Sequence, residues 1–439
     1  MKKTIKFILC VVSIFSTNLI AEEIKNSFSS VDENLLISQD EYVEIIRDTI
    51  LSQPEFREIL ALKQQSTADR NYARRLRFPS LDARVFNDRT MSREIETNAL
   101  RKTRDDTFDA VITIDQPIYT GNEIRSKIKI ANLELNNSSI KTNQITSELI
   151  LAATNIYLDA AISGLISDYS NNLLSKLEKY RDIAKKRFNA GISESTEMAI
   201  VNVRLSELET KNAVLESKKI ESESVFEAFF NIKYNNFGLP KIELLEASLD
   251  NNFKENNYDE RISKNDVKIA KSNMEIVKSQ YRPRFGFNAR YTRYDIDDEA
   301  KDKDLRGGFY MTFPFFNFGR GSAQVASSKA KINQANSKLD QVRRDIKYTK
   351  ASNYGSLVGS LNARNKILDS YNNVKLQRET FSYQMGSTAF SITAYLEAAI
   401  REISIYEQLI RNEKQLLMSS LQTSHSSERL LNRFRIYIN

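Results

Sequence analysis

The sequence predicts a mainly helical fold that is internally duplicated and also contains two pairs of membrane-length strands. Three observations carry this prediction. Residues 121–230 contain almost no Pro or Gly outside one short turn, which predicts a long helical hairpin. The apolar period changes from helical spacing to alternation at two places. The same order of elements then recurs after about 200 residues, which is typical of a duplication.

Residues 1–21 have the pattern of a secretory signal peptide. Three lysines precede an apolar run that is too short to span a bilayer, and Ala21 supplies a small residue at the expected cut. The sole cysteine, Cys10, lies in this run without the small residue that lipid attachment requires before it. We therefore expect neither a disulfide nor a lipid anchor in the mature chain.

The charge distribution argues against a nucleic-acid binder. The net charge of +7 becomes 7 − 3 = +4 once the three signal lysines are removed. Basic and acidic residues interleave along helical faces, as at Glu207, Glu209 and Lys211, and do not gather in one basic patch. No later segment has eighteen consecutive apolar residues, so no transmembrane helix is expected. An exported chain of this kind is periplasmic, secreted or inserted as a β-barrel.

The first repeat, 22–230, begins with a helix that breaks at Pro54 and ends before Pro79, because proline removes a backbone donor and keeps the preceding residue extended. Alternating residues then predict strands at about 79–90 and 106–117 around a polar loop. Each strand has the length that a tilted membrane strand needs.

The hairpin at 121–230 turns at a tip over 188–193. Its first arm carries one narrow apolar stripe that includes Ile166, Leu173 and Tyr180. A helix over 122–188 would be about 100 Å long, a length that only a coiled coil or a stacked helical assembly keeps ordered. An ordinary pair of core helices is the alternative, which the narrow stripe disfavours.

The second half repeats this plan after an irregular connector. The expected segments are the connector at 231–264 with a short helix near 241–247, and the second repeat at 265–415 with a helix at 265–280, strands at about 284–295 and 305–316, and a hairpin at 319–415 whose tip is 383–391. The tail at 416–439 has a short helical pattern that could pack around the helices or remain disordered.

Four strands per chain cannot close a barrel, and an open sheet edge is not tolerated in lipid. Three chains would pool twelve strands around an aqueous lumen, continued by the hairpins as a helical cylinder, and the function that follows is conduction. The second strand pair is rich in aromatic residues, which are typical of the girdles at the two bilayer interfaces. The alternative for these aromatics is the core of a soluble sandwich.

The order and spacing of the tip residues resemble the TolC family of outer-membrane efflux proteins over nearly the whole mature chain. The first tip reads Arg187-Phe188-Asn189-Ala190-Gly191 followed by Thr196-Glu197, and the second reads Tyr383-Gln384-Met385-Gly386 followed by Ser391 and Leu396-Glu397-Ala398. The resemblance implies a homotrimer with a twelve-stranded outer-membrane β-barrel and a periplasmic α-helical barrel. Its implied partners are a periplasmic adaptor (membrane fusion protein), an inner-membrane ABC or proton-driven exporter, and outer-membrane lipid.

The resemblance also implies a gate at the periplasmic tip. Tyr383 matches the gating tyrosine and Glu197 matches an aspartate position, whereas Thr388 stands where the family has an arginine. Glu397 would line the pore if the tip is shifted by two residues, and three copies would form a cation-favouring carboxylate ring. A core aromatic and a solvated carboxylate are the structural alternatives. The residues expected to dock an adaptor are Phe188, Gly191, Thr196, Gly386 and Ser391.

No enzyme, cofactor or metal site is expected. His425 is the sole histidine, and Gly319-Arg320-Gly321 lacks the third glycine of a dinucleotide loop. The acidic loop at 295–304 has Ala300 where a calcium loop needs glycine, so a solvated external loop is favoured. Two other protein classes stay open: a soluble periplasmic coiled-coil adaptor, and a structural coiled-coil protein or adhesin.

Overall fold

The structure is a computed structural model that describes residue 28 and residues 35–89, 91, 106–191, 194–235, 238–241, 257–296, 302–315, 318–384 and 391–438. The expected signal peptide, Cys10, residues 242–247 of the short helix expected at 241–247, and residues 297–301 of the acidic loop lie outside these residues.

The chain divides into two compact units that do not follow the two sequence repeats. Unit 1 comprises Met1–Glu58, Asn143–Tyr258 and Arg344–Asn439, and unit 2 comprises Ile59–Thr142 and Asp259–Arg343. Each unit draws on both repeats, because the long helices α4 (Glu123–Leu177) and α8 (Arg320–Tyr383) contribute one part to each.

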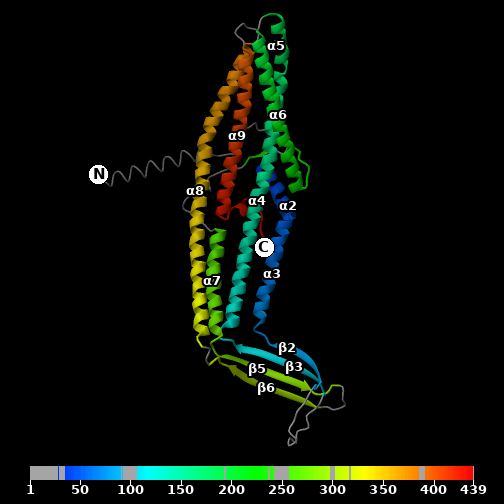
Figure 1. The fold of residues 1–439 in the computed structure, drawn as a ribbon, viewed down its shortest axis with the longest axis vertical. Helices are drawn as coiled ribbons and strands as arrows, with labels where there is room; N and C mark the ends of the chain where they lie inside the picture. Colours follow the sequence, from blue (N-terminus) through cyan, green and yellow to red (C-terminus); the bar gives the residue numbers. More distant parts are fainter. Residues whose placement is uncertain are drawn as a thin grey trace, which may run out of the picture. The chain divides into compact units, whose positions relative to one another are not determined.

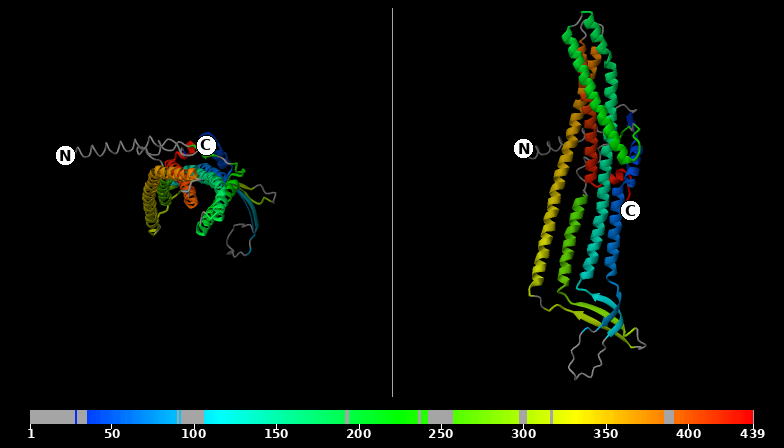
Figure 2. Two further views of the ribbon diagram at one scale, coloured as in Figure 1. Left: turned by 90° about the horizontal axis from the view of Figure 1, so that it is seen from above. Right: turned by 45° about the vertical axis from the view of Figure 1, so that its right-hand side comes forward.

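Unit 1 is a bundle of long helices (Figure 1). Besides parts of α4 and α8, its elements are α2 (Gln39–Ser52), α5 (Lys179–Asn189), α6 (Ser195–Phe230), α9 (Ile392–Ser426), α10 (Leu430–Arg433) and the two-residue parallel strands β1 (Leu36–Ile37) and β4 (Leu239–Pro240). The helices α6 and α9 lie side by side in the views of Figures 1 and 2. Both begin at a hairpin tip, so they run parallel.

The expected single helix over 122–188 is wrong in one detail. The helix is interrupted at Glu178, which separates α4 from α5. No Pro or Gly causes the break, and Glu178 keeps helical backbone angles, with φ −55° and ψ −37°. Two other boundaries also differ from expectation, since α7 (Tyr258–Ser279) begins before residue 265 and α9 continues past residue 415.

The C-terminal tail packs against unit 1, which decides a question that the sequence left open. Phe434 is buried and meets Tyr42 edge to face at a centroid distance of 5.9 Å. Tyr42 also contacts Tyr157 at 5.0 Å and donates a hydrogen bond of 2.7 Å to Thr154. Such aromatic pairs add to the stabilisation from apolar burial, so they hold the tail on α2 and α4.

Unit 2 contains α7, parts of α3 (Pro54–Arg75), α4 and α8, and a four-stranded sheet (Figure 1). Gly121 allows α4 to start close to the end of α7. Its φ is +62°, and a Cβ there would lie 2.8 Å from the carbonyl oxygen of Ser279. Arg282 also donates a hydrogen bond of 3.2 Å to the Gly121 carbonyl.

The sheet is antiparallel with the strand order β2-β3-β5-β6. Its strands are β2 (Ser80–Arg89), β3 (Asp106–Tyr119), β5 (Arg284–Arg293) and β6 (Lys303–Thr312), which overlap the expected ranges. The register between β3 and β5 shifts between Pro117 and Tyr119. A bulge is the usual way to admit a proline inside a paired strand.

Candidate functional site

The four-stranded sheet of unit 2 has one apolar and one polar face. In register, Ala83, Ile112, Tyr291 and Leu305 form one row of the apolar face, and Leu81, Ile114, Ala289 and Gly307 form the next. The opposite face carries the rows Asp82, Thr113, Arg290, Arg306 and Ser80, Asp115, Asn288, Gly308. Apolar and polar residues thus alternate along each strand, and the register aligns the apolar residues of all four strands on one face.

The apolar face is exposed to an extent that a soluble domain rarely tolerates. Leu81 and Leu305 on the two outer strands are 70% and 75% exposed, and Ile112 and Ile114 on the inner strand β3 are 42% and 40% exposed. Exposed apolar surface that is contiguous over several strands marks contact with lipid or protein. Most of the described aromatic residues expected to form a girdle are exposed, namely Phe285, Tyr291, Phe309, Phe313, Phe315 and Phe318, whereas Phe287 and Tyr294 are half-buried.

Two strand edges remain open in the single chain. Strands β2 and β6 are the outer members of the order β2-β3-β5-β6, and within the described residues each pairs on one side only. All ten residues of β2 are exposed. Unpaired edges of this length are templates for pairing with another strand.

At the first hairpin tip, α5 ends in a left-handed glycine. Gly191 has φ +69°, and its amide donates to the Phe188 carbonyl at 2.9 Å. A positive φ at this position explains why the motif needs glycine. Phe188 is 43% exposed, and the Thr196 hydroxyl donates to Glu194 at 3.1 Å. Glu197 is half-buried in the first turn of α6.

At the second tip, Tyr383 ends α8 and is 88% exposed, so it is not a core aromatic within one chain. Among the described residues, no hydrogen bond joins Tyr383 to Glu197 within one chain. Thr388 and Gly386 lie outside the residues described. Ser391 caps α9, since its hydroxyl accepts from the Ala394 amide at 3.3 Å.

Glu397 is paired within the chain, which the sequence did not suggest. Arg204 on α6 donates to Glu397 on α9 at 2.9 Å and to Glu207 at 2.9 Å. The hydrogen bond to Glu207 is the larger cause, and that to Glu397 the next, of the raised pKa of Arg204. About half of the Glu397 side chain is exposed, so its carboxylate contacts solvent and also forms an ion pair with Arg204.

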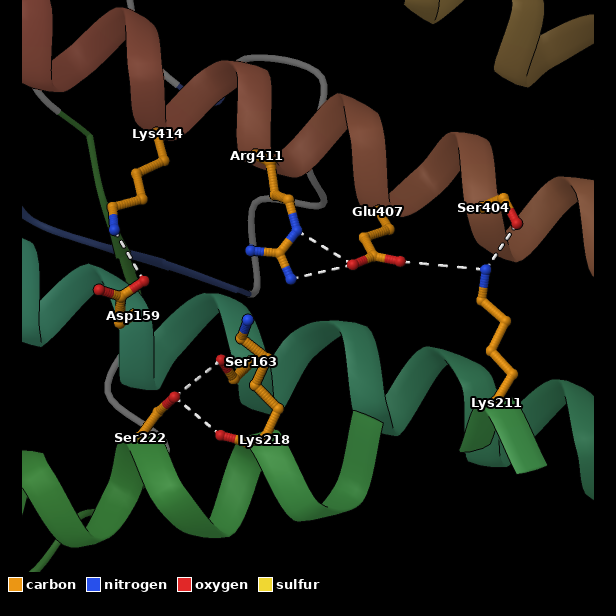
Figure 3. Close-up of polar contacts among 9 residues, drawn as sticks. All are labelled: Asp159, Ser163, Lys211, Lys218, Ser222, Ser404, Glu407, Arg411 and Lys414. Atoms are coloured by element: carbon orange, nitrogen blue, oxygen red, sulfur yellow. Dashed lines mark hydrogen bonds and ion pairs between the residues drawn. The ribbon is translucent and has the colours of Figure 1, made fainter. Parts of the chain in front are cut away.

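The polar contact between α6 and α9 recurs once after seven residues. Seven residues after Arg204 and Glu397, Lys211 donates to the Ser404 hydroxyl at 2.5 Å. The Lys211 ammonium group also lies 3.9 Å from Glu407, which binds Arg411 along α9 (Figure 3). Seven-residue spacing on parallel helices is the geometry of a coiled coil.

The helix α4 joins the same assembly of helices. Lys414 on α9 binds Asp159 on α4 at 2.7 Å, and the hydroxyls of Ser163 and Ser222 lie 3.1 Å apart between α4 and α6 (Figure 3). These contacts connect both hairpins of the chain through the half-buried Lys414, Asp159 and Ser222 and the buried Ser163.

A buried ion pair joins α8 to α9 nearer the tip. Glu402 is fully buried and accepts hydrogen bonds from the Arg378 guanidinium and the Tyr169 hydroxyl. Burial alone would lower the pKa of Arg378. The hydrogen bond to Glu402 and the negative charge of Glu402 raise this pKa by more than burial lowers it, so it lies above its ordinary value. Burial, followed by the bonds to Glu402 and Tyr371, raises the pKa of Tyr169. Arg378 is therefore charged and Tyr169 is a donor at neutral pH.

A second buried ion pair lies three helical turns further along α9. Glu413 is fully buried and accepts a bond of 2.6 Å from Arg364 on α8. Its second oxygen accepts from the backbone amide of Phe28 at 3.1 Å. Both carboxylates thus receive an arginine from the same neighbouring helix.

These two ion pairs were not predicted from the sequence. The available signal was the position of Glu402 and Glu413 inside the apolar stripe of α9, where the neighbouring residues Ala399 and Leu409 are buried. A carboxylate at such a position needs a buried partner. The identity of that partner is not readable from local spacing.

Among the residues that the structure describes, no group of three or more His, Cys, Asp or Glu side chains could hold a metal ion. One helical segment, Glu123–Asn189, is long and apolar enough to span a membrane by length and composition alone. Of its most apolar window, 61% is buried inside the chain, as expected of a core helix.

No protein-family model matches the sequence, and no curated protein matches it significantly. Solved structures match over nearly the whole chain. A membrane protein from Pseudomonas aeruginosa has a TM-score of 0.78 at 12% identity, covering 92% of this chain and 94% of that one. The outer membrane protein VceC of Vibrio cholerae gives 0.72 at 13%, covering 90% and 96%, and the Campylobacter jejuni CmeC outer membrane channel gives 0.70 at 14%, covering 89% and 87%.

At these levels of identity the likeness concerns the fold, and it covers 89–92% of this chain. The chain therefore has the fold of the TolC family of outer-membrane channels, as its sequence resemblance predicted.

Proposed function

We propose that three copies of this chain form an export duct in the outer membrane that extends into the periplasm. The observation that carries the proposal is the sheet of unit 2, whose central apolar rows are exposed while its opposite face is charged. In a membrane barrel, the apolar face meets lipid and the polar face lines an aqueous lumen. The role is conduction rather than catalysis.

The open edges of β2 and β6 support the oligomeric state. Edge groups that lack partners cost several kcal/mol each in lipid, so the sheet must close on other copies. Three chains with four strands each give a twelve-stranded barrel, which exceeds the roughly eight strands that side chains alone can fill. The parallel helices α6 and α9, whose contact recurs after seven residues, support a helical barrel as the second part of the duct.

The duct would receive substrate from an inner-membrane pump, an ABC or proton-driven exporter, through a periplasmic adaptor. Both multidrug efflux and type I secretion fit a conduit whose wall offers few specific contacts. The tip residues Phe188, Gly191 and Thr196 of the first hairpin, with Gly386 and Ser391 of the second, would meet the adaptor.

The tip would also hold the gate. Tyr383, which is exposed in the single chain, would contact Glu197 of a neighbouring copy. The ion pair of Glu397 and Arg204 would lie at the entrance of the duct. Because Arg204 offsets part of the carboxylate charge, a ring of three Glu397 residues would be less negative than three isolated carboxylates.

Adjacent residues of β3 provide a matched test. Ile112 lies on the apolar face and Thr113 on the polar face. Arginine on a lipid-facing position near the bilayer centre costs about 2–4 kcal/mol per copy, whereas a lumen position tolerates it. Ile112→Arg should abolish the heat-modifiable trimer recovered from the outer-membrane fraction, and Thr113→Arg should preserve it.

The measurement is the migration of unheated and heated samples on denaturing gels after membrane fractionation. Equal trimer yield for both variants would overturn the assignment of faces. Recovery of the wild-type protein in the soluble periplasm would instead favour the adaptor alternative, and a surface-attached trimer without conductance would favour the structural one.

A further inference from the structure

One row of the polar sheet face places two arginines directly opposite each other. Arg290 on β5 pairs in register with Arg306 on β6, and the same row contains Thr113 and Asp82. Side chains opposite each other on one face of an antiparallel pair have Cβ atoms about 5 Å apart, and like charges there repel. Both arginines are exposed.

The two arginines differ in their partners. The Arg306 guanidinium lies 2.5 Å from Asp304, which is on the same strand and face. Arg290 has neither an ion pair nor a side-chain hydrogen bond within the described residues. Asp304 therefore balances the charge of Arg306, whereas the guanidinium group of Arg290 is available to bind an anion.

The net charge of this face differs from one row to the next. The row of Asp82, Arg290 and Arg306 sums to −1 + 1 + 1 = +1. The next row toward the loops holds Arg84 and Asp304 and is neutral, and the next row toward the helices holds Asp115 and is negative. The positive excess is thus confined to one level of the strands.

We propose that Arg290 and Arg306 form an anion-binding site in the lumen of the duct, with one site per chain and three at one level of the barrel. This inference rests on the proposed function. Its ligands are carboxylate, sulfonate or phosphate groups carried by substrates in transit. An anion between the two guanidinium groups replaces their repulsion with charge-assisted hydrogen bonds, for which the planar fork of arginine is suited.

Such a site acts on substrates by local concentration. Rings of basic side chains favour anions in a pore, and a narrow low-dielectric wall focuses their field. A site that binds weakly and repeats around the lumen allows an anion to enter and leave. The duct would therefore pass anionic compounds more readily than its acidic tip alone would allow.

The test measures ion selectivity and block of the purified trimer in planar bilayers. In a salt gradient, Arg290→Gln should lower the ratio of chloride to potassium permeability by about twofold. Trivalent citrate added to the bath should reduce wild-type conductance, and Arg290→Gln should weaken this block by about fivefold, the effect of one unit charge at about 4 Å in a water-like dielectric. High salt should diminish both effects.

Arg293→Gln is the matched control, because Arg293 is on the same strand but on the opposite face. It should leave selectivity and citrate block unchanged. An Arg290→Gln channel that conducts but keeps wild-type selectivity and block would overturn the anion site, as would an equal change in Arg293→Gln. Absence of any conductance from the wild-type trimer would instead overturn the proposed duct.

Discussion

The buried ion pair between Arg378 and Glu402 should contribute strongly to the stability of the helical bundle. Glu402 is fully buried and the Arg378 side chain is 15% exposed. Arg378→Met keeps most of the side-chain volume but leaves the carboxylate with Tyr169 as its main donor. Removing one partner of a buried pair costs about 3–5 kcal/mol, because the remaining charge stays desolvated. We expect a value near the lower end, since the Tyr169 bond persists.

The double variant Arg378→Met/Glu402→Gln separates the charge effect from packing. It removes both charges while the glutamine can still accept from Tyr169, so most of the lost stability should return. Arg411→Met on α9 is the surface control. Arg411 binds Glu407 along the same helix and its side chain is 41% exposed, and such exposed pairs contribute about 0–1 kcal/mol.

The assay is thermal unfolding of detergent-solubilised trimers, followed by circular dichroism of the helices at one protein concentration and one heating rate, because oligomerisation and irreversibility affect the midpoint. The reasoning is refuted if Arg378→Met unfolds at the same temperature as Arg411→Met. It is also refuted if the double variant is no more stable than Arg378→Met.

Two further predictions concern the backbone and the tip. Gly121→Ala should destabilise unit 2 by about 1–3 kcal/mol, because the backbone there has a positive φ and the new Cβ would lie close to the Ser279 carbonyl oxygen. Gly164→Ala is the control: the space around its Cβ position is open, so the substitution should be neutral or stabilising in the same unfolding assay. In planar bilayers, Glu397→Gln should reduce cation preference, and Glu197→Ala with Tyr383→Phe should raise single-channel conductance. Unchanged selectivity and conductance would remove the tip residues from the gate.

Sequence periodicity predicted the elements well where the pattern was long and local. Alternation at Leu81, Ala83 and Val85 predicted which residues share a face, and the register of β2 with β3 places these three on the apolar face. The turn at Gly191 was visible because a left-handed residue favours glycine. The interruption at Glu178 was not visible, because no helix-breaking residue marks it.

The candidate site was predicted less completely. Glu397 was identified as a carboxylate near the tip, but its pairing with Arg204 depends on the contact between α6 and α9, which are far apart in the sequence. The same holds for Arg290 and Arg306, whose alignment requires the register of β5 with β6.

The sequence by itself determined which segments are long helices, the alternation of the strands and the glycines of the turns, because these depend on residues within a few positions of one another. Only the tertiary structure decided the strand order, the packing of the tail at Phe434 and the partners of Glu402 and Glu413. Partner choice depends on which distant segments pack together, and a buried carboxylate shows that it needs a cation without showing which arginine provides it.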